Sequence, residues 1–123
     1  MYKNTENIHY CTILSAEQWN FLLDGKSSVF RLRCLHKLMT DAIRTETSSD
    51  VELSVYLGCN RKTVGKLIDS FNRLGMLTTM TNNRTSIHTL HFLTGWYVNG
   101  VLMTNPHYIK PTANTNRQNR DMR

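Results

Sequence analysis

The sequence lacks a long apolar run. No stretch approaches the roughly 20 consecutive apolar residues that a helix needs to cross a bilayer. Residues 1–15 also lack the basic segment followed by an apolar segment that is typical of a secretory signal peptide. These two absences predict a cytoplasmic protein without membrane spans.

Cysteine is scarce, and its spacing is unsuited to cross-links or metal. The chain has three cysteines, Cys11, Cys34 and Cys59, which is an odd number. They lie far apart and form no C-x-x-C pair, which argues against a disulfide framework and a zinc knuckle. His88 and His91 lie three residues apart in a predicted strand, so their side chains would point to opposite faces. We therefore expect no metal and no cofactor.

Motifs that carry catalysis are missing as well. The sequence has no glycine-rich phosphate loop, nucleophile elbow or pair of carboxylates in one element. The acids Asp41, Glu46, Asp50 and Glu52 have the spacing of ordinary surface or capping residues. Without such motifs we expect that the protein is not an enzyme. The chain has 123 residues, of which 40% are hydrophobic and 20% charged, which predicts a single globular domain.

Positive charge is unevenly distributed. The net charge is +6. Residues 61–77 hold four basic residues and one acid, and residues 110–123 hold the same numbers, so each segment contributes +3. Such clustering favours a polyanionic partner.

The N-terminal third predicts a short strand followed by two helices. Residues 8–14 are rich in β-formers, and Ser15 with Gln18 has the capping-box spacing that opens a helix through about residue 24. Ser27 or Ser28 can cap a longer helix over about 29–44, whose apolar residues follow the 3.6-residue period. Three cations fall largely outside that apolar stripe, and we interpret them as a solvated face rather than as DNA contacts: Arg31, Arg33 and Lys37.

The middle of the chain predicts two helices joined by a tight turn. Ser49 or Asp50 caps a short helix over 51–57, and Gly58 ends it in the left-handed conformation. Asn60 caps a second helix over about 61–74, which Gly75 ends. Cys59 is expected to be a small buried side chain at the turn. The buried stripe of the second helix is Val64, Leu67, Ile68, Phe71 and Leu74.

Strands are predicted after this second helix. Residues 76–80 and 85–93 form two strands around a turn at 81–84, with Ile87, Leu90 and Phe92 facing inward and a bulge between Ile87 and Leu90. Asn99-Gly100 between two apolar triplets predicts a further hairpin over 96–104, because both residues tolerate the positive φ of a type I′ turn. Residues 110–123 are predicted to be a basic disordered tail.

This order of elements resembles the winged helix-turn-helix DNA-binding superfamily. The resemblance covers about residues 29–94 and rests on Glu52-Leu53-Ser54, Leu57-Gly58-Cys59-Asn60-Arg61, Thr63-Val64 and Leu74-Gly75-Met76-Leu77. It implies an α+β fold with three to four helices and a small antiparallel sheet, in one domain over 1–109. A second segment, Asn99–Ile109, resembles the end of RepL-like plasmid replication proteins.

The resemblance implies a partner, double-stranded DNA, and a set of residues that bind it. The helix at 61–74 would enter the major groove and the wing at 78–93 would lie on the backbone. Gly65 either admits close approach of DNA or is a tolerated weak point in the helix, and Arg84 either contacts DNA or is a solvated turn residue. The implied DNA-binding residues are Asn60, Arg61, Lys62, Thr63, Gly65, Lys66, Arg73 and Arg84.

Two roles in DNA binding and one alternative remain open from the sequence. The DNA-binding protein would act as a transcriptional regulator or as a plasmid or mobile-element replication factor. The alternative is a protein-interaction or dimerisation module that uses the surface of the 96–104 hairpin, unless that hairpin packs on its own core, which is the simpler interpretation. A homodimer is the default expectation for a DNA reader because two-fold sites double the contact area.

Overall fold

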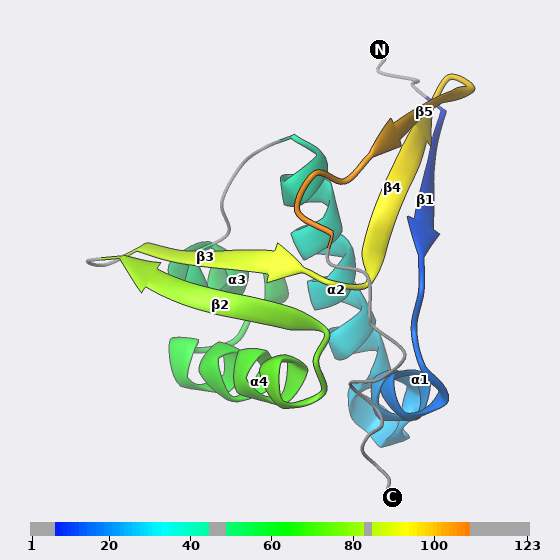
Figure 1. Cartoon of the computed structure of the whole chain (residues 1–123). Coiled ribbons are helices and arrows are strands. Elements are labelled where there is room, and N and C mark those ends of the chain that lie inside the picture. The colour runs from blue at the N-terminus through cyan, green and yellow to red at the C-terminus, as the bar shows by residue number, and fades with distance from the viewer. Residues whose placement is uncertain (1–6, 45–48, 83–84, 109–123) are drawn as a thin grey trace, which may run out of the picture.

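The computed structural model describes residues 7–44, 49–82 and 85–108. These residues form β1 (Ile8–Thr12), α1 (Ala16–Leu23), a short 3-10 helix η1 (Gly25–Ser27), α2 (Ser28–Ile43), α3 (Asp50–Leu57), α4 (Arg61–Arg73), β2 (Leu77–Asn82), β3 (Thr85–Leu90), β4 (Leu93–Val98) and β5 (Val101–Thr104) (Figure 1). The described part of the chain thus contains four α-helices and antiparallel strands, which confirms the α+β prediction.

The strands form two separate antiparallel sheets. One contains β2 and β3 only, and the other has the order β1-β4-β5. The chain changes direction between β3 and β4, so the two sheets run in different directions (Figure 1). As a result β1, at the start of the chain, pairs with a strand that follows all four helices, from Ile8 opposite Val98 to Thr12 opposite Leu93.

The β2–β3 register corrects two predictions. Its pairing is regular from Leu77 opposite Leu90 to Asn82 opposite Thr85, so the predicted bulge in β3 is wrong. Ile87 was expected to face inward, but 45% of its surface is exposed. Leu90 and Phe92 are buried as predicted. Phe92 lies beyond the end of β3, where strand alternation no longer dictates which way a side chain points.

Strand boundaries also differ from the predictions. β2 continues to Asn82 rather than ending at Met80, because Thr81 and Asn82, in the predicted turn at 81–84, pair with β3. β4 begins at Leu93 rather than Trp96. The turn between β4 and β5 is confirmed, with φ of 51° at Asn99 and 86° at Gly100, both in the left-handed region that a type I′ turn requires.

The helices begin where local hydrogen bonds stabilise their first turns. Ser15 and Ser49 both form complete capping boxes, with Gln18 and Glu52 respectively, as the sequence predicts. Ser27 precedes α2, but its side chain makes no capping hydrogen bond. The predicted serine cap of α2 is therefore wrong, because η1 already supplies the turn that leads into the helix.

One hydrophobic core joins all four helices to strands of both sheets. From α4 it receives Val64, Leu67, Ile68 and Phe71, as predicted, whereas Leu74 is only partly buried. Across the core, the rings of Phe21 in α1 and Phe71 in α4 meet edge to face at 5.9 Å. This cluster sets the position of α4 relative to the other helices.

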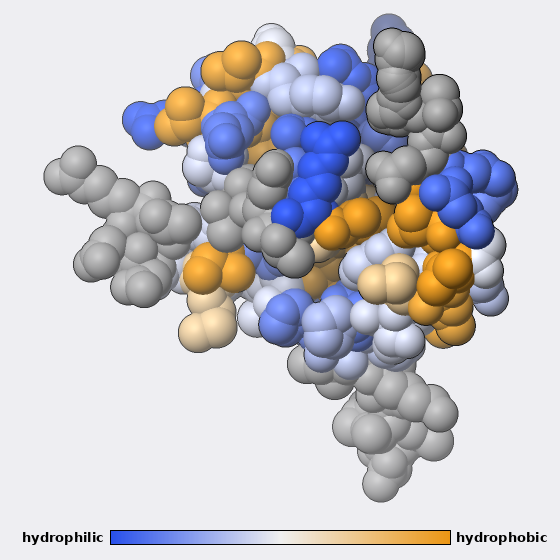
Figure 2. All heavy atoms as spheres, turned by 90° about the horizontal axis from the view of Figure 1, so that it is seen from above, coloured by the Kyte–Doolittle hydropathy of each residue, from blue (hydrophilic) through white to orange (hydrophobic). Residues whose placement is uncertain are grey.

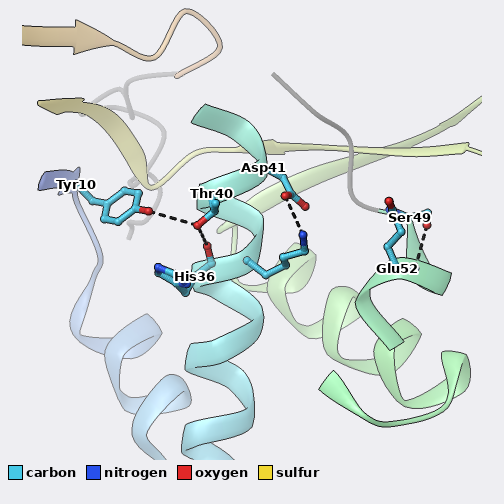
Figure 3. A network of polar contacts seen from close by, with 7 residues as sticks. Tyr10, His36, Thr40, Asp41, Ser49 and Glu52 are labelled. Atoms are coloured by element: carbon cyan, nitrogen blue, oxygen red, sulfur yellow. Dashed lines mark hydrogen bonds and ion pairs between the residues drawn. The ribbon is translucent and has the colours of Figure 1, made fainter. Parts of the chain in front are cut away.

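Polar contacts fasten β1 to α2 (Figure 3). The hydroxyl of Tyr10 lies 3.3 Å from Thr40 Oγ1, and the Thr40 hydroxyl donates to the carbonyl oxygen of His36 at 2.9 Å. The ring of Tyr10 also meets that of His36 edge to face. One turn along α2, Lys37 Nζ pairs with Asp41 Oδ1 at 3.1 Å. The contacts of Tyr10 thus hold the three-stranded sheet against the long helix, whereas the Lys37–Asp41 pair lies within α2.

None of the described helices is long and apolar enough to cross a membrane.

Candidate nucleic-acid interface

The start of α4 is fixed by residues 58–60. Gly58 adopts φ of 70°, which turns the chain sharply after α3. Asn60 then caps α4: its Oδ1 accepts from the Thr63 backbone N–H at 2.8 Å and from the Thr63 hydroxyl at 3.0 Å. Both predictions for this turn are confirmed. Cys59 is only half-buried, so its predicted full burial is wrong.

The outer face of α4 carries charge. Val64, Leu67, Ile68 and Phe71 are buried on the inner face. The exposed residues of the helix are Arg61, Lys62, Thr63, Lys66, Asp69 and Arg73. Four cations and one acid therefore share the surface that α4 presents to solvent.

Two of these cations oppose the helix dipole. Arg61 and Lys62 lie in the first turn of α4, which contains no acidic residue. The N-terminus of a helix carries a partial positive charge, so cations are unfavourable there and anions are favourable. The first turns of α1 and α3 follow the stabilising pattern and contain acids. The first turn of α4 therefore combines the partial positive charge of the helix end with two exposed cations, a setting that favours an anion.

Gly65 is not required by packing. A Cβ built on this residue would meet no atom of its surroundings within 4 Å. The two interpretations of this glycine, close approach of a partner or a tolerated weak point, both fit open space above the helix.

Arg73 and Lys66 occupy the later turns of the same face. Arg73 Nη2 donates to Ser70 Oγ at 3.1 Å, and its place in the last turn is favourable for the helix dipole. Its cationic side chain therefore has a stabilising role in the helix itself. Lys66 is exposed one turn after Lys62, where its charge is available to a partner.

The β2–β3 hairpin is anchored directly to α4. Asn72 Nδ2 donates to Thr79 Oγ1 at 2.9 Å, while Asn72 Oδ1 accepts from the Thr79 backbone N–H at 3.1 Å. Thr79 Oγ1 also contacts His88 Nδ1 in β3 at 2.9 Å. The role of Asn72 cannot be read from the sequence, because it depends on contact with a strand outside its own helix. Arg84, the predicted wing-tip contact, lies outside the described residues.

Three cations of α2 contact neighbouring groups of the protein as well as solvent. The Arg31 guanidinium lies 4.3 Å from the centre of the Phe21 ring and donates to the Phe21 carbonyl oxygen at 2.6 Å. Arg33 lies over the Tyr56 ring and donates to the Tyr56 carbonyl oxygen at 3.0 Å. Lys37 pairs with Asp41. The prediction of a solvated face is therefore wrong for Arg31 and Lys37, which are half-buried, and α2 contributes less free positive charge than α4.

The thiol of Cys34 in α2 lies in the core, where burial favours its protonated form. The pKa of Cys34 is raised from 9.0 to about 12, mainly by burial and in smaller part by repulsion between the thiolate and the neighbouring Cys59 and Asp50. Such a thiol is a poor nucleophile and a poor metal ligand. Within residues 7–44, 49–82 and 85–108, no three His, Cys, Asp or Glu side chains converge on a common point.

Comparisons with protein-family models, with curated proteins and with solved structures find no significant match to this chain. Its function must therefore be inferred from the site itself.

Proposed function

We propose that this chain is a sequence-specific duplex DNA-binding protein of the winged helix-turn-helix type. In this proposal α3 and α4 are the paired helices, α4 enters the major groove, and the β2–β3 hairpin is the wing. The major groove, about 12 Å wide, admits one α-helix. The role is that of a transcriptional regulator or of a plasmid or mobile-element replication factor.

One observation carries the proposal: α4 begins with two exposed cations at its positive end. Two cations at this end oppose the helix dipole, and an anionic partner such as a phosphate would offset that cost. The buried rear of α4 and the Asn72–Thr79 contacts hold the helix and hairpin rigidly, which suits a surface that must match a DNA groove.

The residues of α4 take different parts in the proposed complex. Arg61, Lys62 and Thr63 meet base edges or phosphates at the entrance to the groove. Lys66 and Arg73 neutralise phosphates, which gives affinity without sequence preference. Asn60 positions the first turn, and Gly65 leaves room for the DNA backbone. Arg84, from the tip of the wing, would contact the phosphate backbone.

A second candidate, a protein-interaction module, also has support. Met80 and Ile87 pair across the β2–β3 hairpin, and both are exposed apolar side chains. An exposed apolar pair on a wing suits a protein partner better than a phosphate backbone.

The test is selection of bound fragments from a random duplex pool, followed by titration of the enriched duplex at several salt concentrations. If α4 contacts about three to four phosphates, a plot of the logarithm of the affinity against the logarithm of the salt concentration has a slope of about −2.7 to −3.6. Enrichment of one motif together with this slope supports the proposal. Binding without any enriched motif contradicts sequence specificity, and absence of duplex binding at low salt favours the protein-interaction module.

A further inference from the structure

β5 is an edge strand whose side chains are all exposed. It follows β4 in the order β1-β4-β5, and no described strand pairs with its other side. Three of its residues are large and apolar, with exposed fractions of 61% for Val101, 54% for Leu102 and 45% for Met103. Figure 2 shows hydrophobic side chains gathered on the side of the molecule where β4 and β5 lie. A strand of this kind favours pairing with another chain.

The sheet that contains β5 has no charged residue. Strands β1, β4 and β5 lack Asp, Glu, Lys and Arg throughout, in a chain in which 20% of residues are charged. Proteins commonly protect sheet edges with charges or with irregular pairing. The opposite edge, β1, has a register irregularity between Cys11 and Thr12. In β5 neither protection is present.

The hydrogen-bond pattern shows which groups of β5 face outward. The Asn105 backbone N–H donates to the Thr94 carbonyl oxygen at 3.0 Å, so residues 94 and 105 form a hydrogen-bonded pair. Such pairs alternate along an antiparallel ladder. The backbone groups of Val101 and Met103 therefore point toward β4, whereas those of Leu102 and Thr104 point to the free edge.

We propose that two copies of this chain form a dimer through antiparallel pairing of β5 with β5 about a two-fold axis. In one antiparallel register only, Leu102 and Thr104 both form backbone hydrogen bonds with residues of β5 in the other copy. In that register Leu102 of each copy faces Thr104 of the other. Met103 then lies opposite Met103 of the second copy, in a pair without hydrogen bonds of its own. The product is a continuous six-stranded sheet, three strands from each copy.

A second copy fits this edge better than an unrelated strand. The surface is self-complementary, because the same two residues supply donors and acceptors on both sides of the axis. The charge-free sheets approach without repulsion, although each copy carries a net charge of +6. β5 and α4 lie at opposite ends of the molecule, so the dimer leaves α4 exposed in both copies (Figure 1). The proposal therefore stands whether or not α4 binds DNA.

Sedimentation equilibrium of the full chain, up to roughly 100 µM, tests for the dimer. Thr104→Pro removes an N–H that points away from β4, so it spares the β4–β5 ladder while it deletes a bond at each end of the pairing. We expect its dimer dissociation constant to rise at least about tenfold. Leu102→Lys adds a charge to the edge and has the same expected effect. Val55→Lys, at an apolar residue on α3 that is 78% exposed, is the matched control and leaves the dimer intact.

Cysteine cross-linking tests the register separately. Residues in a pair without hydrogen bonds lie about 4.5 Å apart between Cα atoms, within the range of a disulfide. Under mild oxidation Met103→Cys should give a covalent dimer in high yield. Leu102→Cys, which faces Thr104, and the unmodified chain with its three native cysteines should not.

Each result decides the proposal. A monomer at the highest concentration overturns it, as does a dimer that Thr104→Pro and Leu102→Lys leave unchanged while the melting curves show intact folding. Cross-linking of Leu102→Cys above that of Met103→Cys overturns the register. A dimer that dissociates on the edge substitutions and cross-links through residue 103 supports the proposal.

Discussion

Asn72 of α4 holds Thr79 of β2 through both atoms of its side-chain amide. Its nitrogen donates to the threonine hydroxyl at 2.9 Å, and its oxygen accepts from the threonine backbone N–H at 3.1 Å. These bonds join the end of the charged helix to the hairpin beside it. The relative position of the two elements is therefore set by one residue pair as well as by core packing.

Replacement of Asn72 by alanine should destabilise the fold. The change leaves the Thr79 N–H without its partner in a half-buried site, and we expect the free energy of unfolding to fall by about 1–3 kcal/mol. Urea denaturation measures this loss. Asn20→Ala, at an exposed asparagine of α1, is the control and should change stability by about 0.5 kcal/mol or less. Equal effects of the two substitutions would show that the Asn72–Thr79 bonds contribute nothing.

Cations of α4 should divide into two functional groups. Arg61→Ala or Lys62→Ala should cost about 1–3 kcal/mol of binding free energy on the selected duplex if that residue reads a base, and should relax sequence preference. Lys66→Ala should weaken binding to all duplexes alike and reduce the salt slope by about 0.9. Fluorescence anisotropy with selected and scrambled duplexes separates the two.

The control for these cations is Arg44→Ala. Arg44 is exposed and follows the end of α2 that lies far from α4 in Figure 1. It should leave the salt slope unchanged. A loss of slope as large as that of Lys66→Ala would mean that net charge, rather than α4, determines binding.

Asp69 is the acid on the charged face of α4, and its removal should strengthen binding. Asp69→Asn preserves the shape of the side chain while it removes a repulsion with phosphate, so duplex affinity should rise about two- to fivefold at low salt. Glu17→Gln removes one negative charge from α1 and is the control. Equal gains from both variants would assign the effect to net charge alone.

The two glycines of the α3–α4 region should respond to alanine in opposite ways. Gly58→Ala places a Cβ on a residue with φ of 70° and should lower the free energy of unfolding by about 1 kcal/mol. Gly65→Ala replaces a helical glycine in open space and should raise it by about 0.5–1 kcal/mol. Urea denaturation measures both changes.

DNA titration of Gly65→Ala distinguishes the two interpretations of this glycine. If the DNA backbone approaches α4 here, the more stable variant binds more weakly. Unchanged affinity would mean that Gly65 is only a tolerated weak point in the helix.

Stability should fall at alkaline pH because of Cys34. Its thiol has a pKa of about 12 in the folded protein against 9.0 as the reference value, so between these values the unfolded chain releases a proton that the folded chain retains. Stability is thus fully present below pH 9 and is lost progressively toward pH 12. Urea denaturation at about pH 8 and pH 11 measures this loss, and Cys34→Ala should reduce it. An identical pH dependence in that variant would rule out Cys34 as the cause.

Much of the local structure is determined by the sequence itself. The Ser15–Gln18 and Ser49–Glu52 capping boxes and the Asn60 cap lie where the sequence predicts, because each depends on residues within one helical turn. The Asn99-Gly100 turn and the buried stripe of α4 follow from equally local rules. The charged outer face of α4 is predicted for the same reason.

Only the tertiary structure decided how these elements meet. Nothing near β1 in sequence indicates that it pairs with β4, or that β2 and β3 form a sheet of their own in which Ile87 is exposed. The contacts of Asn72 with Thr79 and of Arg31 with Phe21 likewise join residues on different elements. Caps and turns depend on neighbouring residues, whereas strand pairing and the fate of polar side chains depend on which distant surfaces the core brings together.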